Sequence, residues 1–157
     1  MAPAVGQKAP DFSLVDADLK PRSLAEFKGK TLILAFYPAA FTGVCTKELC
    51  TFRDSLGHLD QLGAAVLGIS VDAPFANKAF ASEHKINFPL LSDYAREVIS
   101  AYDIQFPDLA GLKGYTVAKR AIFVLDKEGV IRYAWVSDDP KKEPDYEEVK
   151  QAVQQIK

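Results

Sequence analysis

The sequence is poor in the residues that cross-link small proteins or bind metals: its 157 residues include two cysteines and two histidines. His58 and His84 stand apart from each other and from the cysteines, whereas a structural zinc site pairs its ligands two to four residues apart. We therefore expect no metal site and no disulfide framework. Two neighbouring cysteines suit a catalytic dithiol in a reducing cytosol better than a structural cross-link.

An excess of one charge is also absent, because 19 Lys and Arg residues face 21 Asp and Glu residues. The basic residues are scattered, so we expect no nucleic-acid partner. No apolar run is long enough to cross a membrane, and Met1 to Gly6 lacks the basic start and apolar centre of a secretory signal. We expect a cytoplasmic protein without a membrane partner, and the sequence is equally compatible with earlier removal of a transit peptide.

The sequence also lacks repeats and low-complexity segments, and its length suits one domain over residues 1–157. Short apolar runs at Thr31–Phe36 and Ala65–Val71 predict buried parallel strands. Other patterns predict helices over 75–84, 94–102 and 145–156, a short edge strand over 88–91, a loop over 104–115 that could cover the active site, and a hairpin of 120–125 with 130–136.

Both cysteines lie directly behind the first apolar run, in the segment from Pro38 to Cys50. The order strand, short loop, helix places Cys45 at or near a helix N-terminus, where unpaired backbone N–H groups and the helix dipole favour an anion such as a thiolate. Thr42 can turn its hydroxyl toward the sulfur or toward a bound substrate oxygen. Pro38 fixes the backbone where the strand ends and supplies no N–H. This segment predicts a small binding site for an oxygen-containing substrate.

The spacing of Pro38, Thr42 and Cys45 resembles the active-site signature of peroxiredoxins, thiol peroxidases that reduce hydrogen peroxide and organic hydroperoxides. Further segments resemble the family in the same order: 6–14, 36–38, 68–72, 88–93 and 120–126. The resemblance spans nearly the whole chain. It implies an α/β thioredoxin-like fold, in which helices flank a central mixed β-sheet, with an N-terminal β-hairpin extension.

The resemblance also implies roles for individual residues. Cys45 corresponds to the peroxidatic cysteine, and Arg120, at the start of a later strand, completes the pocket. Cys50 resembles the resolving cysteine of the Q-type, or bacterioferritin-comigratory, subfamily, whereas a rival subgroup lacks a cysteine there. The cycle needs no cofactor, and a thioredoxin-like protein or another dithiol is the expected reductant. Monomer and homodimer both stay open, because related subgroups differ.

Simpler explanations exist for these residues. Cys50 could be a core residue on the helix face of Leu49 and Phe52, which would make the protein a one-cysteine peroxidase. Arg120 could be an ordinary charge at a strand end. Glu48, one turn after the first cysteine, could hold that arginine in place or act as a favourable acid of the first helical turn.

Two further residues and two other protein classes need consideration. Arg53 could add positive charge near Cys45 or form a surface pair with Asp54 or Glu48, and Trp135 could pack near the site or in the core. A general thiol–disulfide oxidoreductase normally separates its cysteines by two residues, whereas four separate them here. A non-enzymatic holdase would need an exposed apolar surface that the sequence does not reveal.

Helix geometry constrains the expected disulfide. Five residues along a helix correspond to a rise of about 7.5 Å, which exceeds the roughly 7 Å limit between the Cα atoms of bonded cysteines. Cys45 and Cys50 therefore cannot bond while the helix between them is intact. We predict a fully folded reduced state and an oxidised state in which the first turns of this helix unwind.

Overall fold

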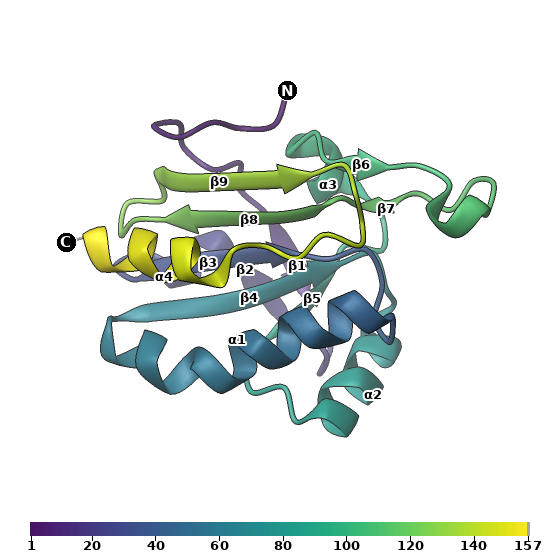
Figure 1. Cartoon of the computed structure of the whole chain (residues 1–157), viewed down its shortest axis with the longest axis horizontal. Coiled ribbons are helices and arrows are strands. Elements are labelled where there is room, and N and C mark those ends of the chain that lie inside the picture. Colours follow the sequence, from purple (N-terminus) through teal and green to yellow (C-terminus); the bar gives the residue numbers. More distant parts are fainter. Residues whose placement is uncertain (157) are drawn as a thin grey trace.

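The computed structural model describes residues 1–156 and contains a seven-stranded sheet with helices on both faces (Figure 1). The sheet contains β1 (Ser13–Val15), β2 (Pro21–Ser23), β3 (Thr31–Phe36), β4 (Ala64–Ser70), β5 (Leu90–Ser92), β8 (Arg120–Leu125) and β9 (Ile131–Ser137), in the order β2-β1-β5-β4-β3-β8-β9. The helices are α1 (Gly43–Gln61), α2 (Pro74–His84), α3 (Glu97–Ala101) and α4 (Tyr146–Gln155). Two short 3₁₀ helices, η1 (Leu24–Phe27) and η2 (Leu109–Gly111), and a small second sheet of β6 (Gln105–Phe106) and β7 (Val117–Ala118) complete the elements.

Strand β3 lies inside the sheet and confirms the predicted buried strand. All six of its residues are buried, because successive side chains point to opposite faces and each face is covered. Leu34 and Phe36 enter one core, and Ile33 and Ala35 enter the other. The strand pairs parallel with β4 and antiparallel with β8, so the sheet is mixed as predicted.

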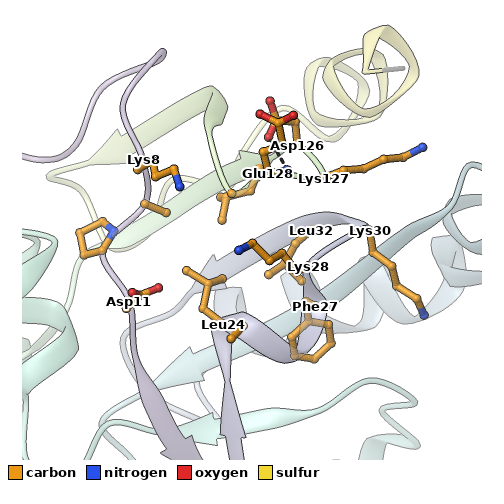
Figure 2. A pocket seen from close by; sticks show the side chains of 15 residues that line it. Lys8, Asp11, Leu24, Phe27, Lys28, Lys30, Leu32, Asp126, Lys127 and Glu128 are labelled. Atoms are coloured by element: carbon orange, nitrogen blue, oxygen red, sulfur yellow. Dashed lines mark hydrogen bonds between the residues drawn. The ribbon is translucent and has the colours of Figure 1, made fainter.

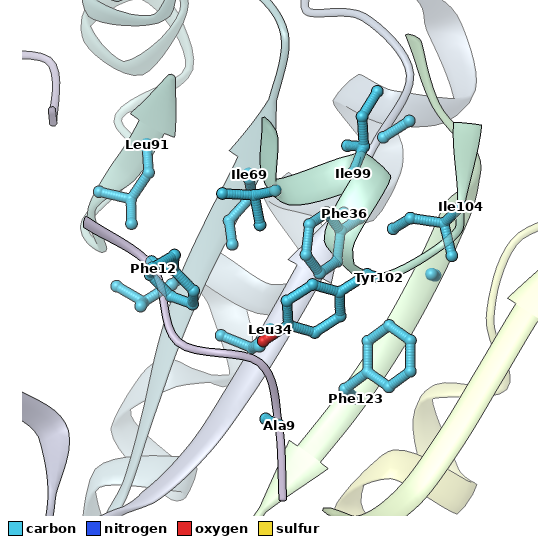
Figure 3. Packing of buried hydrophobic residues seen from close by; sticks show 14 of the residues in the cluster. Ala9, Phe12, Leu34, Phe36, Ile69, Leu91, Ile99, Tyr102, Ile104 and Phe123 are labelled. Carbon is cyan, nitrogen blue, oxygen red and sulfur yellow. The ribbon is translucent and has the colours of Figure 1, made fainter. Parts of the chain in front are cut away.

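The two cores differ in what covers them. On one face, α3 and the N-terminal segment cover an aromatic cluster in which the ring centroids of Phe36 and Tyr102 are 5.2 Å apart and those of Tyr102 and Phe123 are 5.5 Å apart (Figure 3). The buried Tyr102 hydroxyl donates to the Pro10 carbonyl at 2.8 Å. On the other face, α1, α2 and α4 cover the core that includes Cys45. The reactive segment is therefore built into a packed layer.

The region after α2 corrects three predictions. The predicted edge strand over 88–91 is β5, an interior strand, because the N-terminal hairpin pairs with it through Val15 and Ser92. The predicted helix over 94–102 is the shorter α3, because Arg96 has a left-handed φ of 61° and the Asp93 carboxylate accepts the N–H groups of Val98 and Ile99 in the first turn. The predicted loop over 104–115 includes β6 and η2.

The C-terminal part agrees with its prediction. Strands β8 and β9 form an antiparallel hairpin whose turn ends at Gly129, where φ is +81°, a value that glycine adopts without strain. Helix α4 begins after Asp145, whose side chain accepts hydrogen bonds from the N–H groups of Glu147 and Glu148. Among residues 1–156, no helix combines the length and the apolar character needed to span a bilayer.

Candidate active site

The loop between β3 and α1 places Cys45 in the first turn of a long helix, as the sequence predicted. Thr42 has an extended backbone and its carbonyl accepts the first helical hydrogen bond, from Thr46 at 2.9 Å. Cys45 is the third residue of α1 and is completely buried. Within residues 1–156, the backbone N–H groups of Val44 and Cys45 have no protein acceptor. These two donors and the helix dipole favour negative charge at this position.

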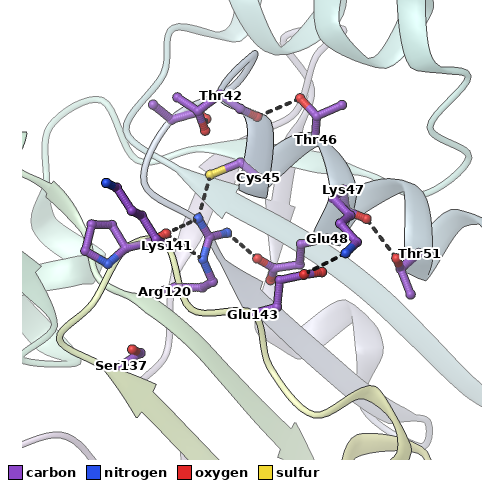
Figure 4. A network of polar contacts seen from close by, with 12 residues as sticks. Thr42, Cys45, Thr46, Lys47, Glu48, Thr51, Arg120, Ser137, Lys141 and Glu143 are labelled. Atoms are coloured by element: carbon purple, nitrogen blue, oxygen red, sulfur yellow. Dashed lines mark hydrogen bonds and ion pairs between the residues drawn. The ribbon is translucent and has the colours of Figure 1, made fainter. Parts of the chain in front are cut away.

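Arg120 reaches the same place from the neighbouring strand of the sheet. It opens β8, which pairs antiparallel with β3, so its side chain starts beside the end of β3. Its Nη2 donates to Cys45 Sγ at 3.1 Å, and its Nε and Nη2 both donate to the Pro140 carbonyl, at 3.2 and 2.7 Å (Figure 4). The residue is only 1% exposed. The guanidinium is therefore a fixed, desolvated cation against the sulfur.

Glu48 holds the other edge of this guanidinium. Its Oε2 forms an ion pair with Arg120 Nη1, and its Oε1 has no protein partner among the described residues (Figure 4). Burial raises the pKa of Glu48 to about 7, although the charge and hydrogen bond of Arg120 act to lower it. Of the two alternatives for Glu48, the geometry selects the one in which it holds the arginine, because the carboxylate points inward.

Thr42 and Pro38 line the same loop. The Thr42 hydroxyl donates to the Ala39 carbonyl at 2.8 Å, so its proton is held within the loop and its oxygen remains able to accept a hydrogen bond. This contact directs the hydroxyl proton toward neither the sulfur nor a substrate oxygen, and both predicted orientations stay predictions. Pro38 is buried where the strand pairing ends, one residue after the Tyr37 N–H donates to the Ile69 carbonyl at 3.0 Å.

Cys50 lies five residues farther along the same uninterrupted helix, and both cysteines are free thiols. It is half-buried, and it is not among the residues of either hydrophobic core, whereas Leu49 and Phe52 belong to the core beneath α1. The alternative that Cys50 is a core residue therefore finds no support in its packing.

The remaining candidates lie outside the site. Arg53 pairs with Asp54 at 2.9 Å and donates to the His84 carbonyl, which confirms the surface-pair alternative with Asp54. Trp135 is half-buried and packs against the core beneath α1. His58 and His84 are in the last turns of α1 and α2, and residues 1–156 contain no cluster of three or more His, Cys, Asp or Glu side chains suited to a metal ion.

Sequence reasoning missed two groups that hold the site in place. One is the Pro140 carbonyl, a backbone acceptor for which no side-chain pattern exists. The other is Asp72, which sequence analysis would treat only as a start signal for α2. It does not cap that helix, and its Oδ2 instead accepts the Ala40 N–H at 2.8 Å. Parallel strands end at the same sheet edge, and this rule was the only available signal that Asp72 would meet the cysteine loop.

A separate hollow lies away from Cys45. A cavity of about 500 Å³ is found between the N-terminal segment, η1 and the β8–β9 turn, with Leu24, Leu32 and Leu125 among its apolar walls (Figure 2). Its walls also include Lys8 and Lys28. It shares no residue with the Cys45 site.

Comparisons with known proteins identify what this chain is similar to. A model described as the AhpC/TSA family matches residues 5–134. The chain is 43% identical over 127 residues to the chloroplastic peroxiredoxin Q of Populus jackii, covering 81% of this chain and 57% of that protein. It is 41% identical over 135 residues to a Coxiella burnetii protein named as a bcp peroxiredoxin, covering 86% of this chain and 89% of that protein. The chain spans 57% and 58% of the chloroplastic relatives from Populus jackii and Triticum aestivum.

Solved structures give the same result for the fold. The peroxidoxin BcpB of Mycobacterium tuberculosis superposes with a TM-score of 0.80 at 30% identity, covering 95% of this chain and 93% of that chain. A peroxiredoxin-like protein of Aquifex aeolicus superposes with a TM-score of 0.86 at 28% identity, covering 98% of this chain and 88% of that chain. The expected thioredoxin-like architecture is confirmed.

Proposed function

This chain belongs to the peroxiredoxins of the AhpC/TSA family, and we propose that it reduces hydrogen peroxide and organic hydroperoxides through Cys45. The observation that carries the proposal is the 3.1 Å contact between Arg120 Nη2 and Cys45 Sγ, at the start of α1. A guanidinium and unpaired helical N–H groups stabilise a thiolate, which is the reactive form of cysteine.

In the proposed first step, the Cys45 thiolate attacks one peroxide oxygen. A sulfur–oxygen bond forms as the O–O bond breaks, and the electron pair leaves on the distal oxygen, which takes up a proton to become water or an alcohol. The cysteine is oxidised to a sulfenic acid. Arg120 and the N–H groups of the first turn are positioned to stabilise the developing negative charge, and Thr42 accepts a hydrogen bond from the substrate.

Cys50 completes the proposed cycle. Its thiolate attacks the Cys45 sulfenic sulfur, a disulfide forms as the S–O bond breaks, and the leaving hydroxide takes up the proton lost by the Cys50 thiol to become water. An external dithiol, most simply a thioredoxin-like protein, then reduces this disulfide by thiol–disulfide exchange. The half-buried position of Cys50 outside both cores supports this role, because it lets the side chain move without leaving a cavity in a packed core.

The proposed disulfide requires α1 to unwind at its start, because the helix runs without interruption from Gly43 to Gln61. We expect the amides of residues 46–50, which donate the first helical hydrogen bonds, to lose exchange protection on oxidation while the centre of β3 keeps it. Hydrogen exchange of the reduced and oxidised protein checks this. A Cys45–Cys50 disulfide formed with full protection of the first two turns would contradict it.

The test of the function is the intact mass of the reduced protein after one equivalent of hydrogen peroxide. We expect the wild type to lose two hydrogens, Cys50→Ser to gain one trappable oxygen, and Cys45→Ser to show no rapid change. A wild type that gains one oxygen and never forms a disulfide would support a one-cysteine peroxidase. A wild type that does not react would exclude peroxide reduction, and a disulfide formed only with a disulfide substrate would favour a general oxidoreductase.

A further inference from the structure

The segment that precedes Cys45 is bound to the neighbouring strand by one carboxylate. Asp72 follows β4 by two residues, and its Oδ2 accepts the backbone N–H of Ala40 at 2.8 Å and the hydroxyl of Ser70 at 2.7 Å. The backbone of Asp72 is also fixed, because the buried Ser92 hydroxyl donates to its carbonyl at 2.6 Å. Asp72 is thus held in position by residues of β4 and β5, independently of its contact with the loop.

The peptide unit that Asp72 binds also binds Thr42. The N–H of Ala40 and the carbonyl of Ala39 belong to one planar peptide, which cannot rotate internally. That N–H donates to Asp72, and that carbonyl accepts the Thr42 hydroxyl at 2.8 Å. A continuous chain of hydrogen bonds therefore runs from the Asp72 carboxylate through this peptide to Thr42. Consecutive hydrogen bonds of this kind polarise and strengthen one another.

The loop needs such an external anchor. Phe41 stands between the anchored peptide and Thr42 with a φ of +67°, a left-handed conformation that is unfavourable for a residue with a side chain. Phe41 is 49% exposed, and its ring packs edge-on against Phe80, with centroids 5.1 Å apart. Among the described residues, Ala40 supplies the only backbone N–H of residues 39–42 that donates to a side chain. Loss of the hydrogen bond from Ala40 to Asp72 would leave the left-handed turn at Phe41 freer to relax.

We propose that Asp72 is a positioning residue for peroxide reduction: through the Ala39–Ala40 peptide it keeps the Thr42 hydroxyl proton on the Ala39 carbonyl and so presents the Thr42 oxygen to the peroxide as an acceptor. The inference rests on the proposed peroxidase function. It does not place Asp72 in contact with the substrate.

The test is a double-mutant cycle on the rate constant for Cys45 sulfenic acid formation, measured by rapid quench and intact mass. We expect Asp72→Ala to lower this rate constant about ten-fold or more, because a hydrogen bond to a charged acceptor is lost. Asp72→Asn should recover most of the rate, since it keeps a carbonyl oxygen for the Ala40 N–H. In a Thr42→Val background, Asp72→Ala should have almost no further effect, because the group it positions is already gone.

The control is Asp16→Ala. Asp16 also binds backbone N–H groups of a turn, those of Asp18 and Lys20, but it does so in the turn between β1 and β2. Asp16→Ala should leave the rate constant within about two-fold of the wild-type value, as expected for independent sites.

The inference is wrong if the effects of the Asp72 and Thr42 substitutions on the rate constant multiply, or if Asp72→Ala reacts as fast as the wild type. Amide exchange at Ala40 tests the anchor without turnover: protection equal in the wild type and Asp72→Ala would also overturn it. An unreactive wild type would overturn the peroxidase function itself, and the role of Asp72 with it.

Discussion

The two ends of the sheet show opposite ways of placing charge. At the start of α1, Arg120 and Glu48 are 1% and 0% exposed and paired with each other. At the other end, a hollow of about 500 Å³ is bordered by Lys8 and Lys28, which are exposed and form no ion pair within residues 1–156 (Figure 2). The lysines that border this hollow are exposed to solvent, whereas Arg120 and Glu48 are not.

The difference teaches that buried charge identifies the reactive end better than the presence of a hollow does. The same two charges interact several times more strongly in a protein interior than in water. A buried guanidinium also cannot reorganise, so its stabilisation of charge at Cys45 is available before the substrate arrives. If this is correct, substitutions should have large effects at the buried end and almost none at the hydrated end.

Replacing the buried cation should give the largest effect. The guanidinium of Arg120 binds Cys45, Glu48 and the Pro140 carbonyl at the same time, and the single ammonium group of Arg120→Lys cannot reproduce this geometry. We expect the rate constant for peroxide reduction to fall by about 10²–10³-fold, the range for loss of one preorganised donor. Stopped-flow measurement with hydrogen peroxide checks this. Arg53→Lys, on the surface of α1, is the matched control, and equal losses in both variants would contradict the comparison.

Replacing the buried anion should change the pH dependence of stability. The pKa of Glu48 rises from its ordinary 4.5 to about 7 because of burial, so the folded state binds more protons than the unfolded state between these values. This contribution to the free energy of unfolding is greatest below pH 4.5 and is lost as the pH rises to about 7. Glu48→Gln cannot titrate.

The stability of Glu48→Gln relative to the wild type should therefore increase between pH 4.5 and pH 7.5. Urea unfolding of both proteins at several pH values measures this difference. The free energy of unfolding of Glu48→Gln minus that of the wild type could instead stay constant or fall as the pH rises. Either result would show that Arg120 cancels or outweighs the effect of burial on the pKa of Glu48.

At the hydrated end, the smallest effect is expected. Lys28→Gln removes an exposed charge without an ion-pair partner in the described chain. We expect the free energy of unfolding to change by less than about 0.5 kcal/mol and the peroxide rate constant to stay unchanged. Thermal unfolding and stopped-flow kinetics check both. A loss comparable with that of Arg120→Lys would remove the distinction between the two ends.

Much of the fold could be predicted from local sequence. The run from Thr31 to Phe36 became β3 with the predicted bounds, because an uninterrupted apolar run suits a strand covered on both faces. Predictions were poorer where a distant segment decided the outcome. The strand β5 was expected at an edge, and only its pairing with the N-terminal hairpin made it interior. The start of α3 depended on the backbone at Arg96, which apolar spacing does not indicate.

The sequence by itself determined the position of Cys45 in the first turn of a helix, because strand, loop and helix follow one another along the chain and need no distant partner. The tertiary structure decided what surrounds that sulfur. Arg120 is 75 residues from Cys45, and Asp72 is 32 residues from the amide that it binds. Strand order brings both to one edge of the sheet, and two of the groups that hold the site, the Pro140 carbonyl and the Ala40 N–H, belong to the backbone. Every residue but proline carries both groups, so residue types cannot reveal which of them the fold will use.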